Sequence, residues 1–144
     1  MKRVYLIGSL RNPAVPAMAN ALRAEGFEVF DDWFAAGPEA DDHWQRYEKN
    51  RGSTYQQALD GRPAQQVFGY DKANLDRADM AVLLFPAGKS GHLELGYFIG
   101  KGKPGFIALP EEPERFDVMY AFATAVCTDF DTLIEKMHAV KVPR

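Results

Sequence analysis

The chain has one cysteine, no long apolar run and no surplus of positive charge. Cys127 has no partner for an internal disulfide and lies in an apolar stretch, where a small buried side chain is its usual role. The apolar part of residues 1–9 is too short for a signal or membrane helix, so we expect a cytoplasmic protein with no membrane partner. The 17 Lys and Arg against 20 Asp and Glu give a net charge of -3, which argues against a nucleic acid polymer as partner. These absences favour a small-molecule ligand.

Motifs that bind metals or nucleotide cofactors are also missing, and we expect neither a metal nor a cofactor. The acidic stretch at residues 41–43 has no second histidine at helical spacing and predicts a solvated helix start. Residues 100–105 match the letters GxGxxG, but they follow an expected helix and precede a strand, the reverse of the dinucleotide fingerprint. Residues 88–90 end like a phosphate loop, yet Leu83 stands where that loop needs glycine. A nucleoside triphosphate site is therefore not expected.

What the sequence does have is enough apolar side chain, 47% of 144 residues, to pack a single domain over residues 1–144. Five apolar runs predict buried parallel strands, at residues 3–8, 27–30, 81–85, 105–109 and 125–128. Helical patterns occur at residues 13–26, 39–49, 54–59, 64–78, 92–102, 116–122 and 130–140. The alternation predicts an α/β fold, a flavodoxin-like three-layer sandwich with a five-stranded parallel sheet.

Residues 33–63 interrupt this alternation with a less regular insert. Two of the expected helices, at residues 39–49 and 54–59, fall within it. We expect the insert to form a lid or a pocket wall. It offers Trp33, Trp44, Tyr47 or Tyr55 to stack on a flat ligand.

Glu94 stands out within residues 81–104, which predict a strand, a tight loop and a helix. With Gly91 as the N-cap, Glu94 falls in the first helical turn, just beyond the carboxyl end of the strand. Ligands bind at that edge of open α/β sheets, and the helix dipole favours an ionised carboxylate there. On these residues alone, Glu94 is either a functional carboxylate or ordinary helix-start chemistry.

Asp71 interrupts the apolar side of the helix expected at residues 64–78. The buried side of this helix is marked by Val67, Phe68, Leu75 and Ala78. An isolated buried carboxylate is costly, so Asp71 must find a partner or a pocket. It either accepts a hydrogen bond from a loop backbone or forms a second carboxylate that faces Glu94.

The loop after the first strand has the composition of a ligand-binding turn. Gly8, Ser9, Leu10 and Arg11 offer backbone N–H groups and one guanidinium at the carboxyl end of that strand. These groups suit a polar or anionic ligand. A simple connecting loop with a solvated arginine fits the same residues.

Taken together, these features resemble the nucleoside 2-deoxyribosyltransferase family, whose superfamily includes the 2'-deoxynucleoside 5'-phosphate N-hydrolases. The resemblance rests on Tyr5, the turn at residues 8–11, Asp71, residues 78–79, and the sequence HLELGYFIGKGKP at residues 92–104. It covers residues 2–131 apart from the insert at 33–63. Its most specific parts are Glu-Leu-Gly at 94–96, Gly-Lys-Pro at 102–104, and the 23-residue spacing from Asp71 to Glu94.

The resemblance implies cleavage or exchange of the N-glycosidic bond of a 2'-deoxyribonucleoside or its 5'-monophosphate. It implies that Glu94 is the nucleophile that attacks the anomeric carbon, that Asp71 aids proton transfer to and from the base, and that Tyr5 holds Glu94 by a hydrogen bond. A retaining transfer needs an ionised carboxylate and an acid for the departing base. We expect the helix dipole to keep Glu94 charged and apolar surroundings to raise the pKa of Asp71.

The resemblance also locates the substrate-binding residues and implies a homo-oligomer, a dimer or higher. Family members have Asp or Ser six residues before the nucleophile, for the sugar 5' group, and this chain has Gly88 there. Residues 89–91 suit a phosphate at a helix start, whereas a carboxylate at Asp117 would repel one. Asp117 and Met119 are expected to reach the neighbouring subunit's site. The full expected set is Gly8, Ser9, Leu10, Arg11, Gly88, Lys89, Ser90, Gly91, Asp117, Met119 and Trp33.

Other readings stay open at this point. The lysine-decarboxylase-like phosphoribohydrolases also place a glutamate after a glycine-rich loop, but their paired glycines and threonine are absent from residues 86–93. A nucleotide-binding sensor or regulatory module without turnover is the alternative of a different class, because a fold does not prove an activity. Whether water or a second base resolves the covalent intermediate depends on how dry the pocket is.

Overall fold

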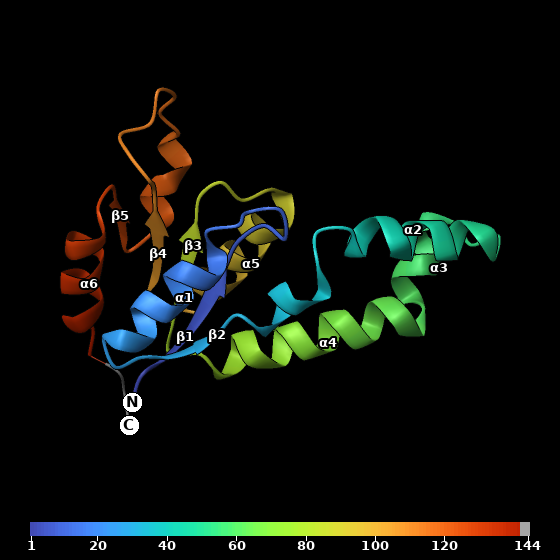
Figure 1. The fold of residues 1–144 in the computed structure, drawn as a ribbon, viewed down its shortest axis with the longest axis horizontal. Coiled ribbons are helices and arrows are strands. Elements are labelled where there is room, and N and C mark those ends of the chain that lie inside the picture. The colour runs from blue at the N-terminus through green and yellow to red at the C-terminus, as the bar shows by residue number, and fades with distance from the viewer. Residues whose placement is uncertain (142–144) are drawn as a thin grey trace.

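Five parallel strands form the centre of the molecule in the computed structural model, which describes residues 1–141. The strands are β1 (Arg3–Ile7), β2 (Glu28–Phe30), β3 (Met80–Leu84), β4 (Gly105–Ala108) and β5 (Ala125–Cys127). They lie in the order β2-β1-β3-β4-β5, so the chain first reaches one edge of the sheet and then crosses to the other (Figure 1). This order is that of the flavodoxin-like fold, which confirms the predicted fold class.

Helices cover both faces of the sheet. α1 (Val15–Ala24) and α6 (Phe130–His138) pack on one face. α4 (Arg62–Arg77), α5 (Lys89–Gly100) and the 3₁₀ helix η2 (Val118–Phe122) lie on the other. Right-handed crossovers explain this division, because the chain moves in one direction to reach β2 and in the opposite direction to reach β5.

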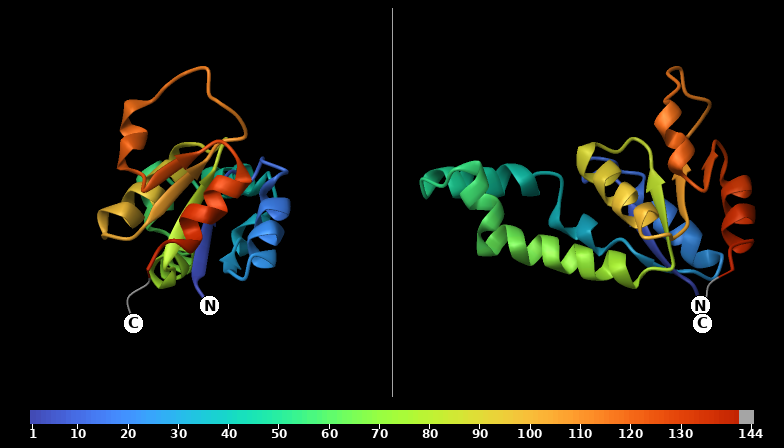
Figure 2. Two further views of the ribbon diagram at one scale, coloured as in Figure 1. Left: turned by 90° about the vertical axis from the view of Figure 1, so that its left-hand side faces the viewer. Right: turned by 180° about the vertical axis from the view of Figure 1, so that it is seen from behind.

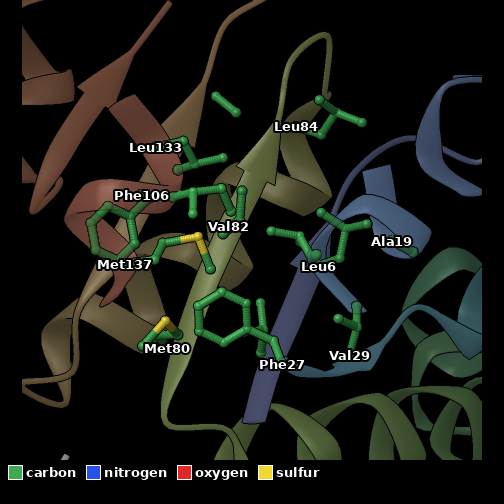
Figure 3. Packing of buried hydrophobic residues seen from close by; sticks show 14 of the residues in the cluster. Leu6, Ala19, Phe27, Val29, Met80, Val82, Leu84, Phe106, Leu133 and Met137 are labelled. Atoms are coloured by element: carbon green, nitrogen blue, oxygen red, sulfur yellow. The ribbon is translucent and has the colours of Figure 1, made fainter. Parts of the chain in front are cut away.

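The face under α1 and α6 carries the larger apolar cluster. Figure 3 shows Phe106 and Val82 on the side of Leu133 and Met137 of α6, and Leu6 next to Ala19 of α1. All five residues of β3 are buried, because the strand is central and covered on both faces. Coverage on both faces also explains why the sequence of this strand is a continuous apolar run and not an alternation of apolar and polar residues.

The opposite face supports the candidate site. There Tyr5 and Leu83 belong to a cluster with Leu95 of α5. Gly105 of β4 allows α5 to approach closely, since a Cβ at that position would lie 2.8 Å from side-chain atoms of Leu95 and Ile99. α5 is therefore seated directly on the sheet.

Between β2 and β3 the chain builds a helical arm that projects from the sheet (Figure 1). After the 3₁₀ helix η1 (Asp32–Ala36) come α2 (Ala40–Asn50) and α3 (Tyr55–Asp60), and α4 then returns to the sheet. We call residues 40–70 the arm. Its buried residues are Glu48 and Ala58, and a capping box between Thr54 and Gln57 starts α3.

Two local predictions are wrong in part. The first half of α4 extends past the sheet, so Val67 and Phe68 are 64% and 59% exposed, and only Leu75 and Ala78 of the predicted stripe are buried. The helix predicted at residues 116–122 is a 3₁₀ turn that begins at Val118. No helix within residues 1–141 is long and apolar enough to span a membrane.

Candidate active site

Tyr5, Asp71 and Glu94 come together from β1, α4 and α5. The Tyr5 hydroxyl donates a hydrogen bond to Glu94 Oε2 at 2.7 Å, as expected from the family resemblance. Asp71 lies near enough for its charge to act on both of the other groups. Tyr5 is buried and the two carboxyl groups are half-buried. The three side chains therefore form one electrostatic unit.

Burial governs the protonation of this unit. The pKa of Glu94 is raised to about 7, mainly by burial; the Tyr5 hydrogen bond opposes this rise and the charge of Asp71 adds to it. Burial also raises the pKa of Asp71. The pKa of Tyr5 lies well above its ordinary value because of burial and the neighbouring Glu94 charge, so Tyr5 remains a neutral donor.

Glu94 lies in the second turn of its helix, which corrects the prediction of a first-turn position. α5 begins at Lys89 with Gly88 as the N-cap. Gly91 is inside the helix, where a Cβ would lie 3.0 Å from Ile7 Cγ2, so this glycine serves close packing and not capping. Because the dipole effect fades beyond the first turn, the dipole does not keep Glu94 ionised as expected, and burial sets its pKa.

The loop at residues 8–11 lies at the carboxyl end of β1. A Cβ at Gly8 would lie 3.2 Å from an α1 side chain and 3.5 Å from Trp33, so only glycine fits without a shift. The Ser9 hydroxyl accepts the Arg11 N–H at 3.1 Å, and Leu10 is half-buried. The Arg11 guanidinium pairs with Asp42 of α2 at 3.0 Å. Arg11 thus joins this loop to the arm.

The start of α5 carries the second group of expected binding residues. Gly88, Lys89 and Ser90 are exposed, and Gly91 is buried. The first turn of α5 contains no acidic residue. The free N–H groups of a helix start and one lysine are suited to an anionic group.

Trp33 is fixed to the sheet and not carried by the arm. Its indole N–H donates to the Leu6 carbonyl at 2.8 Å, and its ring packs against both apolar clusters. The other three aromatic residues considered for stacking, Trp44, Tyr47 and Tyr55, lie on α2 and α3 of the arm. The insert therefore divides into Trp33, which is packed against the sheet, and a projecting part.

Asp117 and Met119 lie on the other flank of α5. They line a groove of about 480 Å³ between α5 and η2. Asp117 accepts the Met119 N–H at 2.9 Å. Among the described residues, those lining this groove include neither Tyr5 nor Glu94. Asp117 and Met119 thus line a groove to which Tyr5 and Glu94 do not contribute.

Two residues near the site were not found from the sequence. The Phe30 ring lies 5.0 Å from the Tyr5 ring, because Phe30 pairs with Tyr5 in the β1–β2 register, and a sequence does not reveal register. His92 Nδ1 lies 2.8 Å from the Gly88 carbonyl, and Nε2 lies 2.9 Å from the Tyr120 hydroxyl. Since a carbonyl only accepts, Nδ1 donates the hydrogen bond to Gly88, and Nε2 forms the hydrogen bond with Tyr120. His92 thus ties the start of α5 to η2.

A cluster of hydrogen bonds joins α4, which carries Asp71, to α5, which carries Glu94. These bonds help to fix the position of one carboxyl group relative to the other. Asp76 of α4 accepts hydrogen bonds from Tyr97 at 2.6 Å and from Lys101 at 2.9 Å. Lys103 donates to the Asp76 carbonyl at 2.7 Å, near the end of α4. Asp76 lies more than one turn beyond Asp71 on α4, Tyr97 lies about one turn beyond Glu94 on α5, and the two lysines follow the end of α5.

Fold and site together define a flavodoxin-like α/β protein with a phenol and two carboxyl groups held together on one face of the sheet. No family model and no curated protein matches the chain. Among solved structures it is similar to a 2-deoxyribosyltransferase of Bacillus psychrosaccharolyticus, with 18% identity, a TM-score of 0.62, and coverage of 96% of this chain and 92% of that one.

A CMP N-glycosidase of Clostridium botulinum is similar at 14% identity and a TM-score of 0.56, over 95% of this chain and 99% of that one. A chain from a complex of a histidine kinase with a response regulator is similar at 17% identity and a TM-score of 0.51, over 96% and 97%. At such identities the likeness shows the fold, which hosts several functions. The presence of a 2-deoxyribosyltransferase and a CMP N-glycosidase among the similar structures is consistent with the family resemblance in the sequence.

Proposed function

We propose that this protein is an enzyme that cleaves or exchanges the N-glycosidic bond of a 2'-deoxyribonucleoside or its 5'-monophosphate through a covalent glycosyl-Glu94 intermediate. The observation that carries this proposal is the 2.7 Å hydrogen bond from Tyr5 to Glu94, with Asp71 within electrostatic reach of both. The named activities of the deoxyribosyltransferase and the CMP N-glycosidase support the same class of reaction.

In the first half-reaction, an oxygen of the ionised Glu94 bonds to C1' of the sugar. The C1'–N bond breaks, its electron pair passes to the nitrogen of the base, and protonated Asp71 supplies a proton to the base. Tyr5 holds Oε2, which leaves Oε1 as the attacking oxygen. The product of this step is a free base and a sugar ester of Glu94.

In the second half-reaction, water or a second base attacks C1'. The ester C1'–O bond breaks, its electron pair returns to Glu94, and Asp71 takes a proton from the attacking group. Water gives hydrolysis and a second base gives transfer. Both outcomes regenerate the starting protonation state, so the two carboxyl groups complete a cycle.

The reaction needs one proton on Asp71 and a charge on Glu94. Burial raises the pKa of both carboxyl groups, and the charge of Asp71 adds to the rise at Glu94, so a proton on one of the two groups is favoured over two charges. The Tyr5 hydroxyl stabilises the ionised form of Glu94 and so favours the proton on Asp71. The phenol therefore acts in the direction of the reactive arrangement, with Glu94 ionised.

The sugar 5' end lies at the start of α5 in this proposal. Gly88 leaves room where a side chain could stand, and no atom lies within 4 Å of a Cβ built there. Lys89 and the N–H groups of the first turn favour a phosphate, and the loop at residues 8–11 adds Arg11. Asp117, from the neighbouring subunit of a homo-oligomer, would favour a hydroxyl instead. Met119, 61% exposed, accompanies it across the interface.

Product analysis tests the proposal. The protein is incubated with deoxyribonucleosides, their monophosphates and a free base, and exchanged nucleoside or free sugar is measured by chromatography. We expect turnover, and Glu94→Gln should lower it by at least about 10³-fold because the nucleophile is lost. Glu39→Gln, at an exposed position outside the site, should leave it unchanged. Absence of turnover on the whole panel, or full activity of Glu94→Gln, contradicts the proposal.

A further inference from the structure

The helix that carries Asp71 packs against the sheet at one end only. Figure 2 shows the first half of α4 running away from the sheet into the arm. Phe68 and Tyr70 in that half are more than half exposed, whereas Leu75 and Ala78 at the end of the helix are buried. Asp71 lies between the two parts, where α4 passes from the arm to the body of the molecule. Its position therefore depends on how firmly the last residues of α4 are held.

Apolar packing alone does not fix that end of α4. The contact of Leu75 and Ala78 with the sheet is non-directional, so it tolerates a small slide or rotation of the helix. Either movement carries Asp71 towards Glu94 or away from it. Hydrogen bonds, in contrast, weaken steeply when their distance or angle changes. Directional contacts between α4 and α5 supply what the apolar packing lacks.

Asp76 makes these directional contacts. Its Oδ1 accepts hydrogen bonds from the Tyr97 hydroxyl at 2.6 Å and from Lys101 Nζ at 2.9 Å, both from α5 or the residue after it. Its Oδ2 accepts from Lys72 of α4 at 3.0 Å. The ammonium groups of Lys72 and Lys101 also lie 5.5 and 5.2 Å from the centre of the Tyr97 ring. Tyr97 is thus held both at its hydroxyl and at its ring.

Lys103 holds the end of α4 separately. Its ammonium group donates to the carbonyls of Asp76 and Ala78 at 2.7 and 2.9 Å, and carbonyls at the end of a helix have no partner within it. The same group lies 5.2 Å from the centre of the buried Phe98 ring of α5. A cation is also favoured there by the helix dipole. The last turn of α4 is therefore joined to α5 and to the residues that follow it.

The cluster keeps its charges over the pH range in which Glu94 titrates. The hydrogen bonds from Tyr97, Lys101 and Lys72 hold the pKa of Asp76 well below its ordinary value, and their bonds to Asp76 raise the pKa of both lysines. The groups that act on Glu94, whose pKa is about 7, are Tyr5 and Asp71. A change near pH 7 therefore reports on the carboxyl pair and not on the cluster.

We propose that Asp76 and Tyr97 are positioning residues, which hold Asp71 at a fixed separation from Glu94 by joining α4 to α5. They act through the two helices, and they keep the arm at the far end of α4 from displacing Asp71. The effect on turnover rests on the proposed function, because proton transfer between Asp71 and a base at C1' requires that fixed geometry.

Tyr97→Phe tests this positioning without changing any charge. With Asp71 held less closely to Glu94, the pKa of Glu94 should fall by a few tenths of a unit towards its value in Asp71→Asn, as followed by NMR titration of ¹³C-labelled glutamate. With a nucleoside substrate, kcat should fall about tenfold at an unchanged KM. Asp76→Asn should change the pKa and kcat further in the same direction. Tyr70→Phe, which removes the hydroxyl of an exposed tyrosine on the same helix, should change neither.

A double-mutant cycle shows whether Asp71 is the link between the cluster and Glu94. When Tyr97→Phe is added to Asp71→Asn, the pKa of Glu94 should not shift further, because no charge remains at position 71 to be moved. A merely structural role of the cluster predicts a lower free energy of unfolding in urea with no change in this pKa or in kcat. If circular dichroism shows that Asp76→Asn is unfolded, Lys101→Gln, which removes one donor, takes its place.

Three results would overturn the positioning. They are an unchanged pKa of Glu94 in both Tyr97→Phe and Asp76→Asn, a shift in Tyr97→Phe that persists in full when Asp71→Asn is present, or an unchanged kcat of both variants on a substrate that the protein turns over. The expected pKa shifts without turnover of any nucleoside or monophosphate would leave the positioning standing and reject the proposed function. Glu94-dependent turnover that neither variant alters would do the reverse.

Discussion

At the scale of single residues, a neutral phenol donates a hydrogen bond to Glu94, and burial raises the pKa of both Glu94 and Asp71. The motif around Glu94 and the spacing to Asp71 could be recognised in the sequence, because family resemblance preserves residue types and distances along the chain. The raised pKa of Glu94 could not be predicted from the sequence, because it results from burial by residues that are remote in sequence. The same holds for Phe30, whose contact with Tyr5 depends on strand register.

Two substitutions should move the pKa of Glu94 in opposite directions. Tyr5→Phe removes the hydrogen bond that lowers this pKa, so it should rise above about 7; Asp71→Asn removes the charge that raises it, so it should fall below about 7. We expect the pKa of Glu94 to rise by about one unit in Tyr5→Phe and to fall by about one unit in Asp71→Asn, as measured by NMR titration of ¹³C-labelled glutamate. The ionised form of Glu94 is the one that attacks. The pH below which kcat/KM falls should therefore be higher in Tyr5→Phe than in the unchanged protein, and lower in any residual activity of Asp71→Asn. Tyr70→Phe, an exposed neighbour, is the control; shifts of equal sign in the two variants would contradict this electrostatic coupling.

At the scale of elements, apolar runs and helical patterns predicted the strands and most helices. The start of α5 was misplaced because glycine and serine read as a turn, whereas Gly91 is needed for contact with Ile7. The burial of α4 was misjudged because a helix pattern says which side is apolar but not how far the helix runs past the sheet. Such errors concern placement between elements, which local sequence does not encode.

Two glycine substitutions test how tightly α5 is seated. Gly105→Ala places a Cβ 2.8 Å from Leu95 and Ile99, so it should lower the free energy of unfolding by about 1–3 kcal/mol and reduce activity by shifting α5. Gly69→Ala, in an exposed turn of α4 with no atom within 4 Å, should instead raise it by about 0.5–1 kcal/mol. Urea unfolding measures both changes. A neutral Gly105→Ala would contradict the close packing of α5 on β4.

At the scale of the whole molecule, the fold class and the five-stranded parallel sheet could be predicted from the alternation of strands and helices, but the projecting arm could not. Residues 33–63 have helical character in sequence, and only the structure shows that α2 and α3 leave the body (Figure 1). The separation of Asp117 and Met119 from Glu94 likewise depends on which flank of α5 receives η2. The molecule thus has a carboxyl pair on one flank of α5 and, on the other, residues expected to serve a neighbouring subunit.

The most direct test of the central claim is intact-mass spectrometry after exposure to a 2'-fluorinated arabinonucleoside, whose fluorine slows breakdown of a glycosyl ester. We expect the protein to gain the mass of one fluorinated sugar, peptide mapping to place it on Glu94, and Glu94→Gln to gain nothing. An adduct on another residue, or turnover of this nucleoside with no adduct at any time point, would contradict a covalent glycosyl-Glu94 intermediate.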